Sequence, residues 1–284
     1  MLKIGSYNDL MVERIVDFGL YLNKKPDEVL LPLKYVPENT HPGDNLRVFV
    51  YTDSEDRPVA TTLKPKAVVG EFAYLLVKDV ASFGVFMDWG LEKDLLVPLN
   101  QQQDRMKAGK HYVVKVCLDQ ETGRVYGTNR ITRNCEKIPT DLVEGQPVDL
   151  LIYGITKIGI KAVVNNRYSG LFYRSDVYAS VSVGDKITGY ISRIREDGKI
   201  DLTLKSPGYR SVSGSGTGIL DVLKKRGGFI PCHDKSSPEE IHRIFSMSKK
   251  EFKKAIGGLY KAGRILITDQ GIRIPLSENT EGGI

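Results

Sequence analysis

The stretch that decides the fold runs from Asp79 to Leu99 and reads DVASFGVFMDWGLEKDLLVPL. Its pattern predicts two strands on either side of a polar break at 88–94. Phe83 and Phe86 are three residues apart, so a regular strand would point their rings to opposite faces. Gly84 lies between them and favours a bulge that turns both rings to the same side. Two aromatic rings on one face of a sheet form a platform on which bases stack, whereas the alternative is that both rings pack in a core.

The same pattern occurs three times along the chain. In each copy an apolar strand ends 13 or 14 residues after a glycine, and a second glycine follows 24 or 25 residues after the first. An alternating strand and a hairpin with a basic residue complete the copy. The first glycines are Gly19, Gly84 and Gly159, the apolar strands end at Pro32, Pro98 and Tyr173, and the second glycines are Gly43, Gly109 and Gly184. Because the offsets are regular, we interpret the pattern as three copies of one small all-β module.

Each module has roughly five short strands, which is typical of a small closed barrel whose alternate residues fill the interior. The linkers between the modules are short, which predicts barrels packed close together. A Gly/Ser-rich run at Ser211–Gly218 predicts a flexible tether after the third barrel. The predicted domains are three barrels at residues 1–65, 66–137 and 138–210 and a fourth, different domain at residues 217–276.

The fourth domain has a helical pattern that leads into a hairpin. A short helix is predicted over 218–226, and capping boxes at 237–240 and 248–251 start two more helices. The third helix is expected to bury Phe252, Ile256, Leu259 and Tyr260 on one face. A β-hairpin with its turn at 269–271 follows. Three helices that lead into a hairpin indicate a winged helix-turn-helix, so the expected fold class is mainly β with a C-terminal α+β part.

Charge is unevenly distributed along the chain, whose formal net charge is +6. Residues 1–146 hold 19 basic and 21 acidic residues, residues 147–216 hold 10 and 6, and residues 217–284 hold 12 and 8. The excess of positive charge in the C-terminal half fits a polyanionic partner, although +6 is also ordinary for a soluble protein of this length. No apolar run approaches the roughly 18 residues of a membrane span, and the N-terminus has no signal-peptide pattern, so we expect a cytoplasmic protein.

Patterns for catalysis or metal binding are absent from the sequence. Cys117, Cys135 and Cys232 form no CxxC motif and suit buried thiols in a reducing cytosol, and the four histidines show no ligand spacing. The chain has no phosphate loop, nucleophile elbow or HExxH motif. The sequence therefore predicts a protein that is not an enzyme and that needs no cofactor or metal.

The repeated pattern of F-G-x-F, L-V-P and a glycine-led strand resembles the S1 type of OB-fold barrel. Three such barrels followed by a winged helix resemble the conserved virulence factor B family of bacterial RNA-binding proteins, and the resemblance extends from Leu2 to about Pro275. It implies binding of single-stranded RNA and a post-transcriptional or translational role in gene regulation, without catalysis.

The resemblance also implies three unequal RNA sites, because S1 domains typically use two aromatics, a histidine, an aspartate and an arginine. The second barrel offers Phe83, Phe86, Asp119 and Arg124, and the first offers Phe18, Tyr21, Asp53 and Arg57. Proline occupies the histidine position in both, at Pro32 and Pro98. The third barrel has Ile158 and Lys161 in place of the aromatics, with Tyr173, Arg195 and Lys199 at the remaining positions. A cation-lined contact with the RNA backbone is therefore expected there.

Lysines on the expected recognition helix of the fourth domain are candidates for contact with duplex nucleic acid. They are Lys249, Lys250, Lys253, Lys254 and Lys261. The alternatives are a solvated helix face, since the wing is short and not basic, or a protein-docking module. Two other functions therefore stay open: a DNA-binding transcription regulator that uses the winged helix, and an interaction scaffold, for example on the ribosome, whose barrels bind protein.

Overall fold

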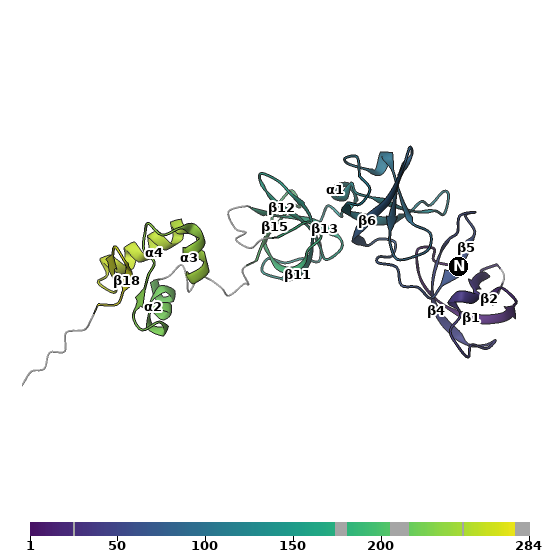
Figure 1. The fold of residues 1–284 in the computed structure, drawn as a ribbon, viewed down its shortest axis with the longest axis horizontal. Coiled ribbons are helices and arrows are strands. Elements are labelled where there is room, and N and C mark those ends of the chain that lie inside the picture. The colour runs from purple at the N-terminus through teal and green to yellow at the C-terminus, as the bar shows by residue number, and fades with distance from the viewer. Residues whose placement is uncertain (25, 174–180, 205–215, 246, 276–284) are drawn as a thin grey trace, which may run out of the picture. The chain divides into compact units, whose positions relative to one another are not determined.

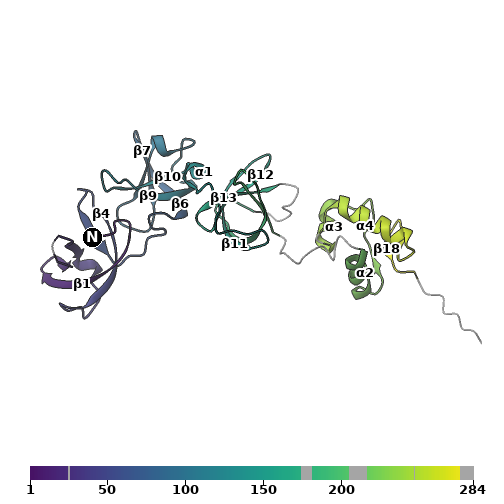
Figure 2. The same cartoon turned by 180° about the vertical axis from the view of Figure 1, so that it is seen from behind.

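The computed structural model describes residues 1–24, 26–173, 181–204, 216–245 and 247–275. The chain divides into two compact units, residues 1–204 and residues 205–284. The first unit contains three small β-barrels in chain order, and the second contains the helices of a winged helix (Figures 1 and 2). The run predicted as a tether lies mostly outside the described residues, and the predicted boundaries between the barrels stay predictions.

The first barrel is closed, with strand order β1-β2-β3-β5-β4. Neighbouring strands are antiparallel except β3 and β5, which are parallel. Its elements are β1 (Ser6–Val16), β2 (Gly19–Leu22), β3 (Val29–Pro32), the 3₁₀ helix η1 (Leu33–Tyr35), β4 (Asn45–Thr52) and β5 (Pro58–Thr61).

The second and third barrels repeat this arrangement. The second consists of β6 (Phe72–Ala81), β7 (Gly84–Asp88), β8 (Leu95–Pro98), η2 (Leu99–Gln101), β9 (His111–Leu118) and β10 (Val125–Thr128). Its sheet order is β10-β9-β6-β7-β8. The edge strands β10 and β8 lie side by side, as the close approach of Gly127 to Val97 shows: a Cβ on Gly127 of β10 would lie 2.8 Å from the Val97 side chain of β8. The third barrel is closed and consists of β11 (Pro147–Ile155), β12 (Gly159–Val164), β13 (Tyr168–Tyr173), β14 (Lys186–Ile194) and β15 (Ile200–Thr203). The predicted fold class is thus confirmed.

The second glycine of each copy has a clear structural role. Its backbone N–H donates to a carbonyl of the first strand at 2.8–2.9 Å, next to the β-bulge of that strand. The three pairs are Gly43 with Val12, Gly109 with Val77, and Gly184 with Ile152. Each of these glycines has φ between +73° and +98°, a conformation that costs little only without a Cβ. The regular spacing in the sequence therefore reflects one backbone turn repeated three times.

The barrels of the first unit share apolar clusters, as the short linkers predicted. Phe49 and Tyr51 of β4 belong to the same buried cluster as Trp89 and the core of the second barrel, and the Phe49 and Trp89 rings meet edge to face at 5.8 Å. A second cluster joins Phe72 and Val113 of the second barrel to Leu151 and Val163 of the third. The short helix α1 (Ile131–Asn134) contributes Ile131 to this second cluster.

The second unit packs three helices against a small sheet. Its elements are α2 (Gly216–Lys225), β16 (Phe229–Ile230), α3 (Pro238–Phe245), α4 (Lys249–Lys261), β17 (Leu266–Thr268) and β18 (Gly271–Arg273), and the sheet order is β16-β18-β17. Both predicted helix starts are capped. Ser237 Oγ accepts from the Glu240 N–H at 3.1 Å, and Ser248 and Glu251 form a reciprocal capping box.

One prediction about α4 is wrong. The helix buries Phe252, Ala255, Ile256 and Leu259, whereas Tyr260 is 55% exposed. At about 100° per residue, Phe252, Ile256 and Leu259 span about 60° of the helix surface, and Ala255 and Tyr260 each lie about 40° beyond one edge of that arc. The helical period therefore does not decide between them, and the packing of the domain buries the Ala255 side. Among the described residues no helix is long and apolar enough to cross a membrane.

Candidate nucleic-acid interface

The aromatic pair of the second barrel lies on one exposed surface, but not for the reason that the sequence suggested. Phe83 is in the turn between β6 and β7, where it is 57% exposed, and Phe86 is half-buried on β7. Their rings meet edge to face, with centroids 5.9 Å apart at 89°. The pairing of β6 with β7 is regular next to Gly84, so the predicted bulge there is wrong. Gly84 is needed because a Cβ would lie 2.6 Å from the Val97 carbonyl oxygen of β8.

The first barrel presents the same pair at the same position. Phe18 is 58% exposed in the turn before β2, Tyr21 is half-buried, and the ring centroids are 6.3 Å apart at 83°. The Arg14 guanidinium lies 4.0 Å from the Tyr21 ring centroid and forms an ion pair with Glu28. A cation therefore already covers one face of Tyr21, which leaves Phe18 as the more accessible ring.

Apolar residues recur close to both aromatic pairs in the sequence, and the sequence analysis did not include them among the site residues. Ile15 and Val80 occupy equivalent positions four residues before the first glycine of their barrels, and both are exposed. Leu33 and Leu99 donate their backbone N–H groups to the Phe18 and Phe83 carbonyls at 3.0 Å, and Leu33 is exposed whereas Leu99 is half-buried. The repeat is the sequence signal that could have identified these positions, because an apolar residue recurs at each of them in the first two barrels.

The predicted aspartate–arginine pairs differ between the first two barrels. In the first, the Arg57 guanidinium donates twice to Asp53, at 2.8 and 2.9 Å. Partial desolvation raises the pKa of the Asp53 carboxyl, but hydrogen bonds from Arg57 outweigh it and leave that pKa below its usual value. In the second, Asp119 accepts from the Glu121 and Thr122 N–H groups of its own turn.

Arg124 forms an ion pair across the contact between the first two barrels. Its guanidinium binds the Asp56 carboxylate of the first barrel, and this hydrogen bond lowers the pKa of Asp56. Lys93 reinforces the contact, because its ammonium donates to the Asp53 carbonyl at 2.6 Å and lies 4.0 Å from Asp56. Arg124 therefore lies at the end of its own hairpin, as predicted from the sequence, and also contacts the first barrel.

The third barrel gathers the predicted cations around a pocket of about 340 Å³. Lys161, Arg195 and Lys199 all line it. The Arg195 guanidinium donates to both oxygens of Asp201, at 2.9 and 3.0 Å, and to the Tyr173 hydroxyl, and these bonds raise the pKa of Arg195. Ile158, at the position of Phe18 and Phe83, is 68% exposed. The aromatic platform of the other barrels is replaced here by charged walls.

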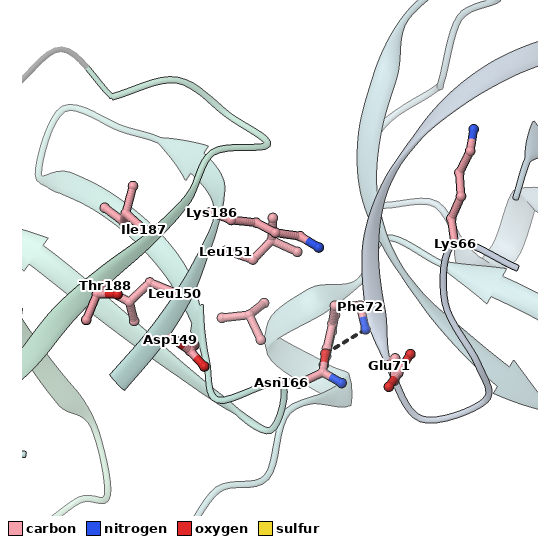
Figure 3. A pocket seen from close by; sticks show the side chains of 11 residues that line it. Lys66, Glu71, Phe72, Asp149, Leu150, Leu151, Asn166, Lys186, Ile187 and Thr188 are labelled. Atoms are coloured by element: carbon pink, nitrogen blue, oxygen red, sulfur yellow. Dashed lines mark hydrogen bonds between the residues drawn. The ribbon is translucent and has the colours of Figure 1, made fainter. Parts of the chain in front are cut away.

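A larger pocket, of about 430 Å³, lies where the second and third barrels meet (Figure 3). Asn166 of the third barrel accepts from the Phe72 N–H at 2.7 Å at its edge, and Lys186 extends toward the second barrel. Lys66, on the other side, forms an ion pair with Asp88 at 2.7 Å. None of the predicted site residues lines this pocket.

Helix α4, the predicted recognition helix, carries most of its lysines on its exposed side. Lys250, Lys253, Lys254 and Lys261 are exposed, whereas Lys249 is half-buried and donates to the Lys235 carbonyl at 3.3 Å. The exposed Tyr260 is about 20° from Lys253 around the helix, because seven residues make nearly two turns. An aromatic ring thus accompanies the basic face.

Cys135 and Cys232 are buried thiols. Burial raises the pKa of the Cys135 thiol to about 11 and also raises that of Cys232, so neither is a thiolate near neutral pH. In the described part of the chain, no three His, Cys, Asp or Glu side chains are grouped so that they could hold a metal ion.

Comparison with known proteins agrees with this architecture. Residues 4–63 match the S1 domain family, and residues 217–274 match the CvfB-like winged helix domain family. The chain is 28% identical to the protein YitL of Bacillus subtilis over 277 residues, which are 93% of this chain and 91% of YitL. It is 25% identical to conserved virulence factor B of Staphylococcus aureus over 244 residues, 81% of each chain. A solved structure of a multidomain protein with nucleic acid binding domains from Streptococcus pneumoniae has 26% sequence identity and a TM-score of 0.42, covering 96% of this chain and 98% of that one.

Both matched families are nucleic-acid-binding domains, and neither is an enzyme family. The surfaces described above lie within them or within the repeats of the same barrel. The chain is similar over most of its length to the conserved virulence factor B proteins, its first barrel matches the S1 domain family, and its C-terminal domain matches the CvfB-like winged helix domain family.

Proposed function

We propose that this protein binds single-stranded RNA and acts without catalysis as a post-transcriptional or translational regulator in the cytoplasm. The observation that carries the proposal is the exposed aromatic pair of Phe83 and Phe86, repeated as Phe18 and Tyr21. The pair recurs at the same position in two barrels, and every base has a π-face that stacks on such rings. The relatives named conserved virulence factor B support extending the regulatory role to virulence.

The binding energy would have two sources on different parts of the chain. Stacking on the first two barrels contributes about 1–3 kcal/mol per base and depends little on sequence. Lys161 and the exposed lysines of α4 would contact phosphates and release counterions, so affinity would fall as salt rises. The exposed Tyr260, on the same face of α4 as Lys253, adds one further surface for stacking on the winged helix.

The test is a titration of the intact chain with single-stranded RNA, single-stranded DNA and duplex DNA of one sequence, at two salt concentrations. We expect RNA to bind most tightly. Preference for the duplex would instead identify a DNA-binding regulator that uses the winged helix, and absence of binding to all three would favour the protein scaffold.

The aromatic pair has its own test. Changing Phe83 and Phe86 to alanine should weaken RNA binding by about 2–4 kcal/mol, because two stacking surfaces are lost. The matched control changes both to leucine, which keeps apolar area and removes the ring faces. RNA affinity should fall in both variants. If the leucine variant binds RNA as the wild type does, the surface acts by apolar contact and stacking is excluded.

A further inference from the structure

The pocket on the third barrel has a wall that does not belong to the barrel. The segment that links the second and third barrels contributes Thr132, Cys135, Glu136 and Lys137 to its lining. This segment therefore lies along the same face that carries Lys161 and Arg195. The segment thus encloses one side of the pocket.

The linking segment is held in place by several bonds. The Glu136 N–H donates to the Arg167 carbonyl at 2.9 Å, and the Arg167 guanidinium binds the Glu136 carboxylate at 2.8 and 2.9 Å. The same guanidinium donates to Asp141 at 2.6 Å. A Cβ on Gly198 would lie 2.5 Å from the Lys137 carbonyl oxygen, so the linker backbone rests directly on the hairpin that follows β14. The wall is thus part of the folded structure.

Most charges around the pocket are already neutralised by a neighbour. Arg195 is paired with Asp201, Lys199 with Asp197 at 2.5 Å, and Glu136 with Arg167. Lys137 and Lys161 have no acidic partner among the residues that the structure describes. One comes from the linker and the other from β12, and both line the pocket. The charge available to a ligand is therefore positive and comes from both walls.

A short row of hydroxyl groups forms another part of the lining. The Tyr153 hydroxyl lies 2.7 Å from Ser169 Oγ and 3.2 Å from Thr132 Oγ1. Hydroxyls both donate and accept, so this row matches the mixed donors and acceptors at the edge of a base. Leu171 and Ile200 supply apolar surface beside it. The pocket volume lies at the small end of the range of about 300–1,000 Å³ for small-ligand sites.

We propose that this pocket holds one nucleotide, with its phosphate on Lys137 and Lys161 and its base against the hydroxyl row. The proposal rests on the proposed function and deepens it. The first two barrels offer open platforms that accept any base, whereas the third is a walled site that selects among bases. The linker is then part of the binding surface as well as a connection.

The first test measures phosphate contact in the intact chain. The variants are Lys137→Ala and Lys161→Ala, and the control is Lys186→Ala, an exposed lysine of the same barrel that lines the other pocket (Figure 3). The probe is single-stranded RNA of about 12 nucleotides, within the site sizes of OB folds. Each variant should bind roughly 3- to 10-fold more weakly and lose about 0.7 from the salt slope, while the control stays unchanged.

The second test measures base selection. Thr132 is exposed, so Thr132→Val removes one hydroxyl while keeping the shape of the side chain. The ratio of affinities for the four homopolymer RNAs should change. Titration with the four nucleoside monophosphates then distinguishes a free nucleotide from a strand, because a free ligand would bind alone and compete with the RNA.

The outcomes separate the two proposals. If the intact chain binds RNA and the Lys137 and Lys161 variants match the Lys186 control, the pocket proposal is overturned and the RNA-binding proposal stands. If Thr132→Val leaves the four affinities in the same ratio, the base does not face the hydroxyl row and the selective site is overturned. If the intact chain binds neither RNA nor nucleotide, both proposals fail.

Discussion

Single residues in this protein have two kinds of role, and sequence alone does not separate them. Arg57 and Arg124 occupy the same position in their hairpins, yet Arg57 binds Asp53 of its own barrel and Arg124 binds Asp56 of the neighbouring one. The difference arises because Trp89 and Lys93 place the second barrel against the first. Arg124 therefore contributes to the contact between barrels, in addition to its predicted place near bound RNA.

The pair of Asp56 and Arg124 predicts a pH dependence. The ordinary pKa of aspartate is about 3.9, and Arg124 lowers it in the folded state. Such a carboxylate stabilises the fold above its unfolded pKa, and this stabilisation is lost as the pH falls through the folded pKa. The melting temperature of Asp56→Asn should therefore lie below that of the wild type at neutral pH, and the difference should vanish in strong acid.

The control for this prediction is Asp104→Asn, which changes an exposed carboxylate that has no ion pair in the described structure. Its melting curve should follow the wild type at each pH. A deficit of Asp56→Asn that is the same from neutral to acid pH would show that the ion pair contributes nothing.

Gly84 predicts a steric effect at the scale of one atom. Gly84→Ala should destabilise the second barrel by about 1–3 kcal/mol, because the new Cβ would lie 2.6 Å from a carbonyl of β8. Gly258→Ala is the contrasting control, since no atom lies within 4 Å of its added Cβ inside α4, and it should stabilise by about 0.4–1 kcal/mol. Hydrogen exchange of the intact chain measures both. Equal effects at the two glycines would contradict the steric explanation.

At the scale of elements, α4 shows how a helix start and a helix face are specified by different rules. The start depends on neighbouring residues, and the predicted capping box is present, with Ser248 accepting from Glu251. The face depends on what packs against the helix, and there Ala255 is buried while Tyr260 is not. The exposed tyrosine then becomes available beside the lysines.

The capping box predicts a local loss of stability. Ser248→Ala removes the acceptor for an N–H at the start of α4 and should cost about 0.5–2 kcal/mol. Amide exchange in the first turn of α4 should accelerate. The control is Glu251→Gln, because glutamine also occurs at this position of capping boxes, and amide exchange in the first turn should stay close to that of the wild type. Unchanged exchange in Ser248→Ala would mean that tertiary packing alone holds the helix start.

At the scale of the whole molecule, stacking groups and charge are separated along the sequence. The exposed aromatic pairs lie in the first two barrels, and the excess of basic residues lies after residue 146. Fragments divided at residue 145 would not test this cleanly, because Glu136 and Asp141 are bound to Arg167 of the third barrel. Substitutions in the intact chain avoid that damage.

This separation predicts that substitutions of lysines in α4 and of aromatic residues in the second barrel change the salt dependence of RNA binding differently. Lys253→Ala with Lys254→Ala should reduce the slope of log affinity against log salt by about 1.4, because two phosphate contacts are lost. Phe83→Ala with Phe86→Ala should lower affinity at every salt concentration and keep the slope. The control is Lys107→Ala with Lys110→Ala, two exposed lysines of the second barrel. A larger change of slope in that control than in the α4 variant would refute this separation.

The sequence by itself determined the modules, because the repeated glycines, the apolar alternation and the capping boxes are local requirements of the backbone. Gly43, Gly109 and Gly184 are readable at a fixed spacing since each makes the same turn within its own barrel. Only the tertiary structure decided what each module contacts. The pairing of Arg124 with Asp56 and the linker wall at Lys137 depend on how barrels pack, and residues far apart in the chain meet there without a local pattern. Packing also left Phe83 in water, since the turn that holds it projects away from the core that Val85 and Met87 fill.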